Sequence, residues 1–501
     1  MYYFIPSWYR KDGSLNCSDL PWYAKQQNSD FDDTISQLHI FASQNEDVTL
    51  LMLGYSPQLR YTLHREDLLD IPYVSLFDQA QGIKARKVGL FTYRDLNWPS
   101  DVEWVFTPFV ILAKRNGKLY ASIDFGKEGF MLSVTFYKED VKTRLVIFDD
   151  RGFISSVTFY NEGVEEYTNF YNERADWVMR MVNVNGTVYI NPDYKKDFQK
   201  KMYRSLDELI GEKFTNFMES HSSDDVIIMA GDEHHNHIVL NAPIKQKVIM
   251  SIYGTRMNIP DHIEELKKPH ALIVDRQEGI DILQNQFHLK NVYNISPFDT
   301  RFELGQSQRT HLLKIYYPIE KMINKQHIIT ILQYMETNPN VQLYLGLYSF
   351  QHEIETQVKD DLHECLEAAN IEDFVLEGDN VNGEIEIPKE ERVFIRKIMT
   401  ENDLLRELKD IRLIVDLREH PDVFTMIAGM SSGIPQIVRD ENDYVKHKKN
   451  GLVLSDLEQD IKYYLEDLDH WNASLVYCYS MIQENTGEEI LNKWKEIINH
   501  E

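Results

Sequence analysis

The sequence predicts an α/β protein with two Rossmann-like domains and an antiparallel β-meander inserted in the first. Short apolar segments alternate with helix-like segments in residues 1–102 and again from residue 224 onward, a pattern typical of a parallel sheet covered by helices. Residues 103–190 instead show short alternating strands separated by Asn-Gly and similar turns, which indicates hairpins. The length of 501 residues suits about two to four domains with their own cores.

The order of elements supports this division. An apolar strand at residues 2–5 ends at Pro6, a helix is expected near residues 31–43, and a further strand at residues 48–53 ends before Gly54. Strand, helix and strand in succession begin a parallel α/β layer. After the meander, apolar strands return at residues 226–229, 247–252 and 271–274.

The hairpins of the meander are predicted from their turns. Alternating segments such as residues 119–125 and 133–137 are bounded by turn sequences that favour positive φ angles. We expect the many Tyr and Phe side chains here to form one packed face of a sheet, with a ligand-facing aromatic platform as the alternative. The turn sequences are Asn116-Gly117, Asp150-Arg151-Gly152, Asn161-Glu162-Gly163 and Asn185-Gly186.

These patterns divide the chain into five segments. Residues 1–102 and 191–300 are expected to form the first Rossmann-like domain, with the meander at 103–190 inserted between them. Residues 301–474 are expected to form the second Rossmann-like domain, and 475–501 a C-terminal helix.

Composition excludes several classes of protein. The chain has 53 Lys and Arg against 80 Asp and Glu, a formal charge of −27, which disfavours nucleic-acid binding. The three cysteines lack CxxC spacing, so neither a disulfide framework nor a zinc knuckle is expected. No signal peptide and no membrane span is expected from the apolar runs. We therefore expect a soluble cytosolic protein.

Several catalytic motifs are absent or stand in the wrong context. The sequence has no P-loop, no GxGxxG fingerprint and no HExxH. Gly429-Met430-Ser431-Ser432-Gly433 matches the GxSxG motif of a nucleophile elbow. It follows a predicted helix over residues 421–430, however, and a true elbow follows a strand. We therefore disfavour serine hydrolysis and expect Gly433 to end the helix.

Two acidic or histidine-rich segments are weak metal candidates. The segment Asp232-Glu233-His234-His235-Asn236-His237 follows a strand, but adjacent imidazoles diverge and no remote ligand is evident. A solvated loop is the expectation, with a metal site as the alternative. Asp467-Leu468-Asp469 matches the DxD motif with which some sugar transferases hold a metal and a diphosphate. It lies in helix-like sequence, so we expect it to be a solvated helix face.

Residues 411–454 are the most informative segment. They read as a strand, a loop, a helix and a second strand, with Ser432-Gly433-Ile434-Pro435 at the turn and Asn450-Gly451 beyond it. In this order of elements and small residues the segment resembles the donor-binding block of GT-B glycosyltransferases, specifically the retaining group related to glycogen synthases. The resemblance implies two domains facing a cleft, a C-terminal helix that packs back on the first, and a helix N-terminus that faces the diphosphate of a nucleotide-sugar.

The carboxylates of that family are missing here. The family has two glutamates with seven residues between them, and alignment on the Gly-Ile-Pro turn places His420 and Ala428 there. Its second domain begins with an Arg and a Lys that contact the diphosphate; here Tyr316 replaces the Arg and Lys321 remains. We expect a dismantled donor site without a catalytic residue, metal or cofactor. Its positions are Tyr316, Lys321, His420, Ala428, Gly433 and Pro435.

The start of the chain carries a closer resemblance. Residues 1–9, Met-Tyr-Tyr-Phe-Ile-Pro-Ser-Trp-Tyr, and Pro21-Trp22-Tyr23 resemble the family of first accessory secretory (Asp) proteins of the accessory Sec system in Gram-positive cocci, over the whole chain. Members are GT-B-like and lack the donor-site residues. The resemblance implies a cytoplasmic subunit, with a peripheral position at the inner face of the membrane as an option. It also implies a complex with the second and third Asp proteins, which works with the accessory SecA motor ATPase to export serine-rich-repeat glycoprotein adhesins.

The function expected is therefore that of a non-catalytic GT-B-like export subunit that binds partners, with the sugar-bearing substrate as a further ligand. The alternative is an active retaining UDP-sugar glycosyltransferase acting on a Ser/Thr-rich adhesin, in which Lys321, Glu419 or His420 would replace the lost glutamates. A purely structural scaffold without glycan affinity is the third option.

Overall fold

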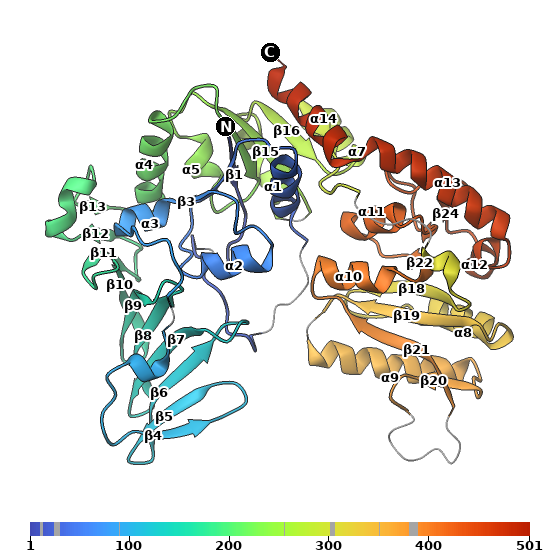
Figure 1. Cartoon of the computed structure of the whole chain (residues 1–501), viewed down its shortest axis with the longest axis horizontal. Helices are drawn as coiled ribbons and strands as arrows, with labels where there is room; N and C mark the ends of the chain where they lie inside the picture. Colours follow the sequence, from blue (N-terminus) through green and yellow to red (C-terminus); the bar gives the residue numbers. More distant parts are fainter. Residues whose placement is uncertain are drawn as a thin grey trace. The chain divides into compact units, whose positions relative to one another are not determined.

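The computed structural model describes two compact units (Figure 1). The first consists mainly of residues 1–24 and 41–273, and the second mainly of residues 25–40 and 294–501. The boundary expected between residues 300 and 301 adjoins a stretch outside the described residues. The structure describes all residues except 11–13, 25–30, 90, 255, 301–305, 350, 380–388 and 501.

A seven-stranded sheet forms the centre of the first unit, in the order β17-β16-β15-β14-β1-β2-β3. β1 pairs in parallel with both β2 and β14, and all but one of the residues of these three strands are buried. Continuous apolar runs fit a sheet that is covered on both faces. The strands are β1 (Tyr2–Ile5), β2 (Val48–Met52), β3 (Tyr73–Ser75), β14 (Val226–Ala230), β15 (Lys247–Ile252), β16 (Ala271–Val274) and β17 (Val292–Asn294).

Helices follow the strands of this first part of the chain at the expected places. The helix expected near residues 31–43 is α1 (Asp33–Ser43). The others are α2 (Leu59–Arg65), α3 (Leu76–Gln81), α4 (Leu206–Glu219), α5 (Asn236–Leu240), α6 (Ile263–Leu266) and α7 (Gln277–Asp281), with short 3₁₀ or π turns at Tyr93–Asp95, Pro192–Asp197, Ile259–His262, Ile282–Gln286 and Gln306–Arg309.

The second unit is built on another seven-stranded sheet, in the order β20-β21-β19-β18-β22-β23-β24. The pairs of neighbouring strands are parallel, and their apolar residues pack with those of the flanking helices into one core. The strands are β18 (Leu313–Ile319), β19 (Val341–Leu347), β20 (Phe374–Leu376), β21 (Glu390–Lys397), β22 (Ile411–Asp416), β23 (Gln436–Val438) and β24 (Gly451–Val453).

The helices of the second unit include two at the end of the chain. The single C-terminal helix expected at residues 475–501 is instead two helices. The first begins at Leu468, and the second begins after a break at Asn485 and Thr486, where the side chain of Thr486 caps it. No helix in the described part of the chain combines the length and apolar character that a membrane span needs. The helices are α8 (Lys325–Thr337), α9 (His352–Ala368), α10 (Glu401–Leu408), α11 (Val423–Ser431), α12 (Leu457–Leu465), α13 (Leu468–Glu484) and α14 (Gly487–Asn499).

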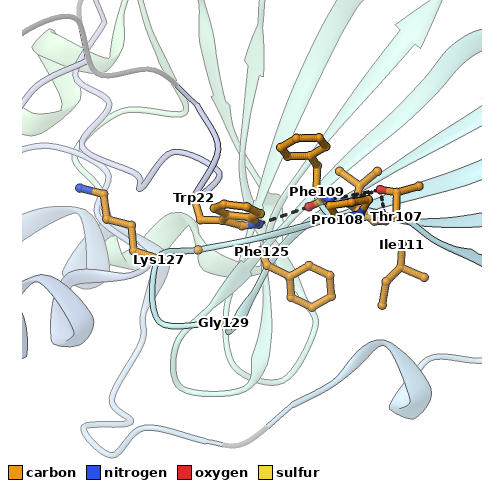
Figure 2. A pocket seen from close by; sticks show the side chains of 10 residues that line it. Trp22, Thr107, Pro108, Phe109, Ile111, Phe125, Lys127 and Gly129 are labelled. Atoms are coloured by element: carbon orange, nitrogen blue, oxygen red, sulfur yellow. Dashed lines mark hydrogen bonds between the residues drawn. The ribbon is translucent and has the colours of Figure 1, made fainter. Parts of the chain in front are cut away.

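The predicted hairpins form most of one ten-stranded antiparallel sheet in the first unit, and its last strand, β13, lies beyond the predicted end at residue 190. The turns at Asn116-Gly117 and Glu162-Gly163 have positive φ at both residues, as the sequence predicts for tight hairpins. The turns after β4 and β6 border a pocket (Figure 2). The strands are β4 (Glu103–Phe106), β5 (Ile111–Arg115), β6 (Lys118–Phe125), β7 (Met131–Lys138), β8 (Val141–Asp149), β9 (Phe153–Asn161), β10 (Val164–Tyr171), β11 (Trp177–Val182), β12 (Val188–Ile190) and β13 (Met202–Tyr203).

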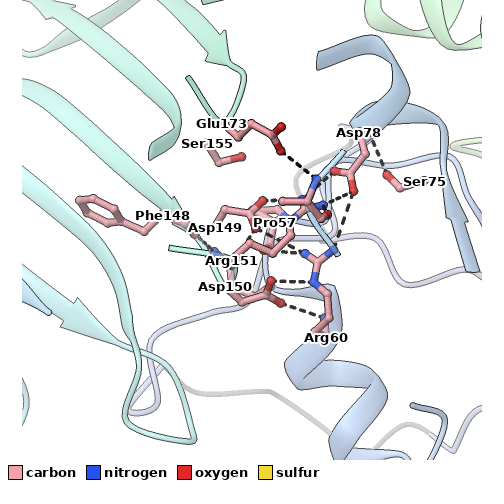
Figure 3. Close-up of polar contacts among 12 residues, drawn as sticks. Pro57, Arg60, Ser75, Asp78, Phe148, Asp149, Asp150, Arg151, Ser155 and Glu173 are labelled. Carbon is pink, nitrogen blue, oxygen red and sulfur yellow. Dashed lines mark hydrogen bonds and ion pairs between the residues drawn. The ribbon is translucent and has the colours of Figure 1, made fainter. Parts of the chain in front are cut away.

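Buried ion pairs attach this sheet to helices α2 and α3 (Figure 3). Arg151, in the turn between β8 and β9, contacts Asp149 at 2.6 Å and Asp78 of α3 at 2.7 Å. Asp150 in the same turn accepts from the Nε of Arg60 at 2.6 Å and from its backbone N–H at 2.9 Å. The Arg60 and Arg151 side chains are only 4% and 2% exposed. The meander is therefore held to the first unit by charges that water does not screen.

Arg151→Ala is expected to lower the free energy of unfolding by about 3–5 kcal/mol, because it leaves the buried Asp149 carboxylate without its closest cation. Urea unfolding followed by circular dichroism measures the change. Arg174→Ala is the matched control, since its ion pair with Asp176 is exposed and should leave the unfolding midpoint unchanged. Equal destabilisation by both variants would show that the buried cluster does not hold the sheet.

Candidate functional site

The carboxyl edge of the second sheet is the first candidate site. β18 pairs with β19 on one side and with β22 on the other, so the strand order reverses between β18 and β22. In open parallel sheets, ligands bind beside the carboxyl ends of the strands at such a reversal. The loop that leaves β22 and the N-terminus of α11 lie at this place.

Arg418 dominates the charges of this edge. Its guanidinium donates to both oxygens of Asp416, at 2.9 and 2.7 Å, and to Asp422 at 2.7 Å. The Asp416 side chain is fully buried and that of Arg418 is 11% exposed. Burial opposes the charge of Arg418, but the two carboxylates outweigh this effect and raise its pKa. The guanidinium that precedes α11 is thus neutralised within the chain.

The N-terminus of α11 is also occupied by the chain itself. Asp422 is its N-cap, and the carboxylate accepts from the backbone N–H of Thr425 at 2.6 Å and from its hydroxyl at 2.8 Å. A free helix N-terminus attracts anions because its N–H groups lack partners. Here a carboxylate already meets that demand, and its charge repels a second anion.

Two buried tyrosines extend this cluster into the sheet. The Tyr316 hydroxyl donates to that of Tyr348 at 3.0 Å, and Tyr348 lies 2.8 Å from the Thr425 hydroxyl. Burial raises the pKa of both tyrosines, so both stay neutral. Gly346 of β19 makes room, since a Cβ there would lie 2.0 Å from the Tyr316 hydroxyl oxygen. Tyr316 is therefore a packed core residue.

The positions that the resemblance places in the donor site differ in burial. Lys321 is exposed just beyond the end of β18, and His420 is exposed in the loop before α11. Ala428 is fully buried inside α11. Gly433, at φ +69°, ends that helix as predicted, and the buried Pro435 precedes β23.

The serine of the GxSxG sequence does not lie at a nucleophile elbow. Ser431 is the last residue of α11 and is fully buried, so the helix precedes the turn, as the sequence indicates. The sequence motifs do not single out Asp416, Arg418 and Asp422. The signal available was an acid-x-base spacing at the end of an apolar strand, which by itself does not distinguish a buried cluster from solvated charges.

The carboxyl edge of the first sheet is the second candidate site, at the corresponding reversal between β1 and β14. Asp232 accepts from the Ser7 hydroxyl and from Nδ1 of His234 at 2.6 Å. His234 stacks on Tyr9, with ring centroids 4.9 Å apart. The expectation of a solvated loop is wrong here, because Asp232, His235 and Asn236 are buried. Partners from β14 and from the segment after β1 bond Asp232 and His235, and Asn236 accepts from the backbone N–H of Asp232 at 2.9 Å.

His235 is held neutral at this edge. Its Nε2 donates to the carbonyl of Ala230 at 2.7 Å, and its Nδ1 accepts from the Tyr9 hydroxyl at 3.0 Å. Burial lowers the pKa of His235 to about 4, although the Asp232 charge acts in the opposite direction. Within the described residues, no group of three or more His, Cys, Asp or Glu side chains is arranged to hold a metal ion.

Stability should fall as the pH drops from about 6.5 to about 4, because the unfolded chain takes up a proton on His235 that the folded chain does not. His235→Gln keeps a polar side chain without an ionisable ring and should remove up to about 3 kcal/mol of this pH dependence. Urea unfolding of both proteins between pH 7 and pH 4 gives the difference, in which other titrating groups cancel. Identical pH profiles would contradict the neutral state of His235.

Comparison with known proteins identifies the family. The family model for the first accessory secretory (Asp) protein of the accessory Sec system matches residues 1–500. The protein of the same description from Streptococcus gordonii is 37% identical over 99% of this chain and 98% of its own length. A crystal structure of accessory secretory proteins 1, 2 and 3 of Streptococcus pneumoniae contains a chain with a TM-score of 0.86 and 30% identity over 99% of both chains.

The fold is shared more widely than the sequence. The pneumococcal O-GlcNAc transferase GtfA, solved with UDP and GlcNAc, matches with a TM-score of 0.69 over 99% of this chain and 98% of its own, at only 12% identity. A likeness at that identity concerns the fold alone. The chain has the GT-B glycosyltransferase-like fold predicted from its sequence, and it belongs to the family of the first accessory secretory (Asp) protein of the accessory Sec system.

Proposed function

We propose that this protein is a non-catalytic subunit of the accessory Sec export machinery. It assembles with the second and third accessory secretory proteins, and the complex works with the accessory SecA motor in export of serine-rich-repeat glycoprotein adhesins. Two observations support the assembly: the chain belongs to the family of the first of these proteins, and a relative is solved in a structure of proteins 1, 2 and 3. The location that we propose is the cytoplasm, with a peripheral position at the inner face of the membrane as an option.

The proposal that it does not transfer sugar rests on the N-terminus of α11. A nucleotide-sugar bound there would bring a diphosphate against the Asp422 carboxylate, while Arg418 is already paired twice. If the ligand displaced Asp422, the Thr425 N–H and the Arg418 guanidinium would each lose a hydrogen-bond acceptor that the ligand would have to replace. The dismantled donor positions Tyr316, His420 and Ala428 add no carboxylate that could hold a ribose or a sugar.

An active retaining glycosyltransferase remains the alternative. It would need Lys321, Glu419 or His420 to contact the donor, and all three are exposed near the same sheet edge. Exposed side chains lose more conformational entropy on binding than packed ones, so they provide a weak replacement for a preorganised site.

Calorimetric titration with UDP, UDP-GlcNAc and UDP-Glc in the presence of Mg²⁺ tests the catalytic alternative. We expect no heat of binding and no shift in the melting temperature, because the anion position is filled by Asp422. The pneumococcal GtfA is the positive control, since it is solved with UDP. Saturable micromolar binding by this chain would overturn the proposal and favour the transferase.

Co-expression with the second and third accessory secretory proteins tests the assembly. The three chains should elute together in size-exclusion chromatography and remain together at 0.5 M NaCl. At this salt concentration the Debye length is about 4–5 Å, so weak surface ion pairs are screened. Elution of this chain alone at all concentrations would contradict its role as a subunit.

A further inference from the structure

A pocket lies at one end of the meander, and none of its lining residues belongs to the carboxyl edge of the first parallel sheet (Figure 2). Its volume is about 330 Å³, at the lower end of the range of ligand pockets and suited to a ligand of one or two rings. The turn between β4 and β5, the turn between β6 and β7, and Trp22 from the segment after β1 form its walls.

Both turns are fixed by their own hydrogen bonds. The Thr107 hydroxyl accepts from the backbone N–H of Val110 at 2.9 Å and donates to its carbonyl at 2.8 Å. Across the pocket, Gly126 donates its N–H to the carbonyl of Phe130 at 2.9 Å, and Gly129 has a φ of +79° that completes the turn. A ligand would therefore meet a preformed hollow, which lowers the cost of binding.

Aromatic rings are presented to solvent although their positions are fixed. The backbone N–H of Trp22 donates to the carbonyl of Phe125 at 2.9 Å, and its indole N–H donates to the carbonyl of Phe109 at 3.3 Å. The Trp22 and Phe109 rings stack with centroids 5.8 Å apart and planes 19° from parallel. Even so, they remain 45% and 54% exposed. Exposed, immobilised rings beside a hollow are typical of a binding surface.

The charges around the pocket favour a neutral ligand. Among the described residues that line it, Lys127 alone is charged, and neither turn adjoins a helix. Phosphate groups are bound by several cations or by helix N-termini, and neither is present in this lining. The electron-rich faces of aromatic rings attract partially positive C–H groups, and a pyranose ring carries such groups on one face and hydroxyls at its edge. Backbone groups of the turns can bond those hydroxyls.

We propose that this pocket binds a neutral monosaccharide unit through stacking on Trp22 and Phe109. The source of the sugar rests on the proposed function: it is a glycan on the serine-rich substrate rather than a free nucleotide-sugar. The site would allow the protein to hold a glycosylated segment without any transfer chemistry, and it needs neither Arg418 nor the N-terminus of α11.

The test uses the full chain and three probes: a serine-rich peptide carrying N-acetylglucosamine, the same peptide without sugar, and methyl N-acetylglucosaminide. Binding is followed by saturation-transfer NMR and by titration of the ligand. We expect the glycopeptide and the methyl glycoside to bind and the bare peptide not to bind. Trp22→Ala and Phe109→Ala should each weaken binding roughly tenfold, and Trp22→Phe should restore most of it.

Phe106→Ala is the matched control, because Phe106 is an aromatic residue of the same sheet end, 64% exposed, that does not line the pocket. It should leave the affinity unchanged. Binding that Trp22→Ala leaves intact, binding of the bare peptide alone, or no saturable binding would each overturn the proposal. Co-elution of Trp22→Ala with the other accessory secretory proteins separates failure of this site from failure of the assembly.

Discussion

The burial of Arg418 between two carboxylates determines the carboxyl edge of the second sheet. An unpaired guanidinium would be expensive at a side-chain exposure of 11%, so Asp416 and Asp422 must be present together with it. Asp422 then caps α11, and Thr425 connects the cap to the buried hydroxyl of Tyr348. A ligand anion could enter only by breaking this set of bonds. The edge therefore keeps the backbone geometry of an anion site while its charge is satisfied from within.

The core of the second unit is formed mainly by apolar side chains of the sheet and of its flanking helices. Ile315, Leu343 and Leu413 of three neighbouring strands are fully buried and pack against the helices of the second unit. Tyr316 adds to this packing instead of facing a ligand, and Gly346 accommodates it. Most of this core is formed by side chains outside the expected donor positions, so a GT-B-like fold does not by itself imply sugar transfer.

The features that the sequence predicts depend on neighbouring residues, whereas those made by distant segments could not be predicted. Asn116-Gly117 defines a hairpin because both residues accept positive φ, and Gly433 ends α11 for the same reason. Trp22, by contrast, meets Phe109 across 87 positions of the chain. The spacing of apolar residues predicts which face of a helix or strand is buried, but it does not predict which loops contact one another. The expectation of a solvated histidine loop was wrong for this reason, since the partners that bury His235 include Tyr9, from the segment after β1.

The attachment of the meander decides what a ligand in its pocket can do. Trp22 belongs to the segment between β1 and α1, and Asp19 of that segment pairs with Arg65 of α2 at 3.1 Å. In an antiparallel meander the turns after β4, β6 and β8 lie at the same end of the sheet. The buried ion pairs of Arg60 and Arg151 attach the turn after β8 to α2 and α3. The end of the sheet that carries the pocket is therefore joined to helices α2 and α3 of the first unit. A sugar bound there, as proposed, would be held by an element that buried ion pairs join to helices of the first unit.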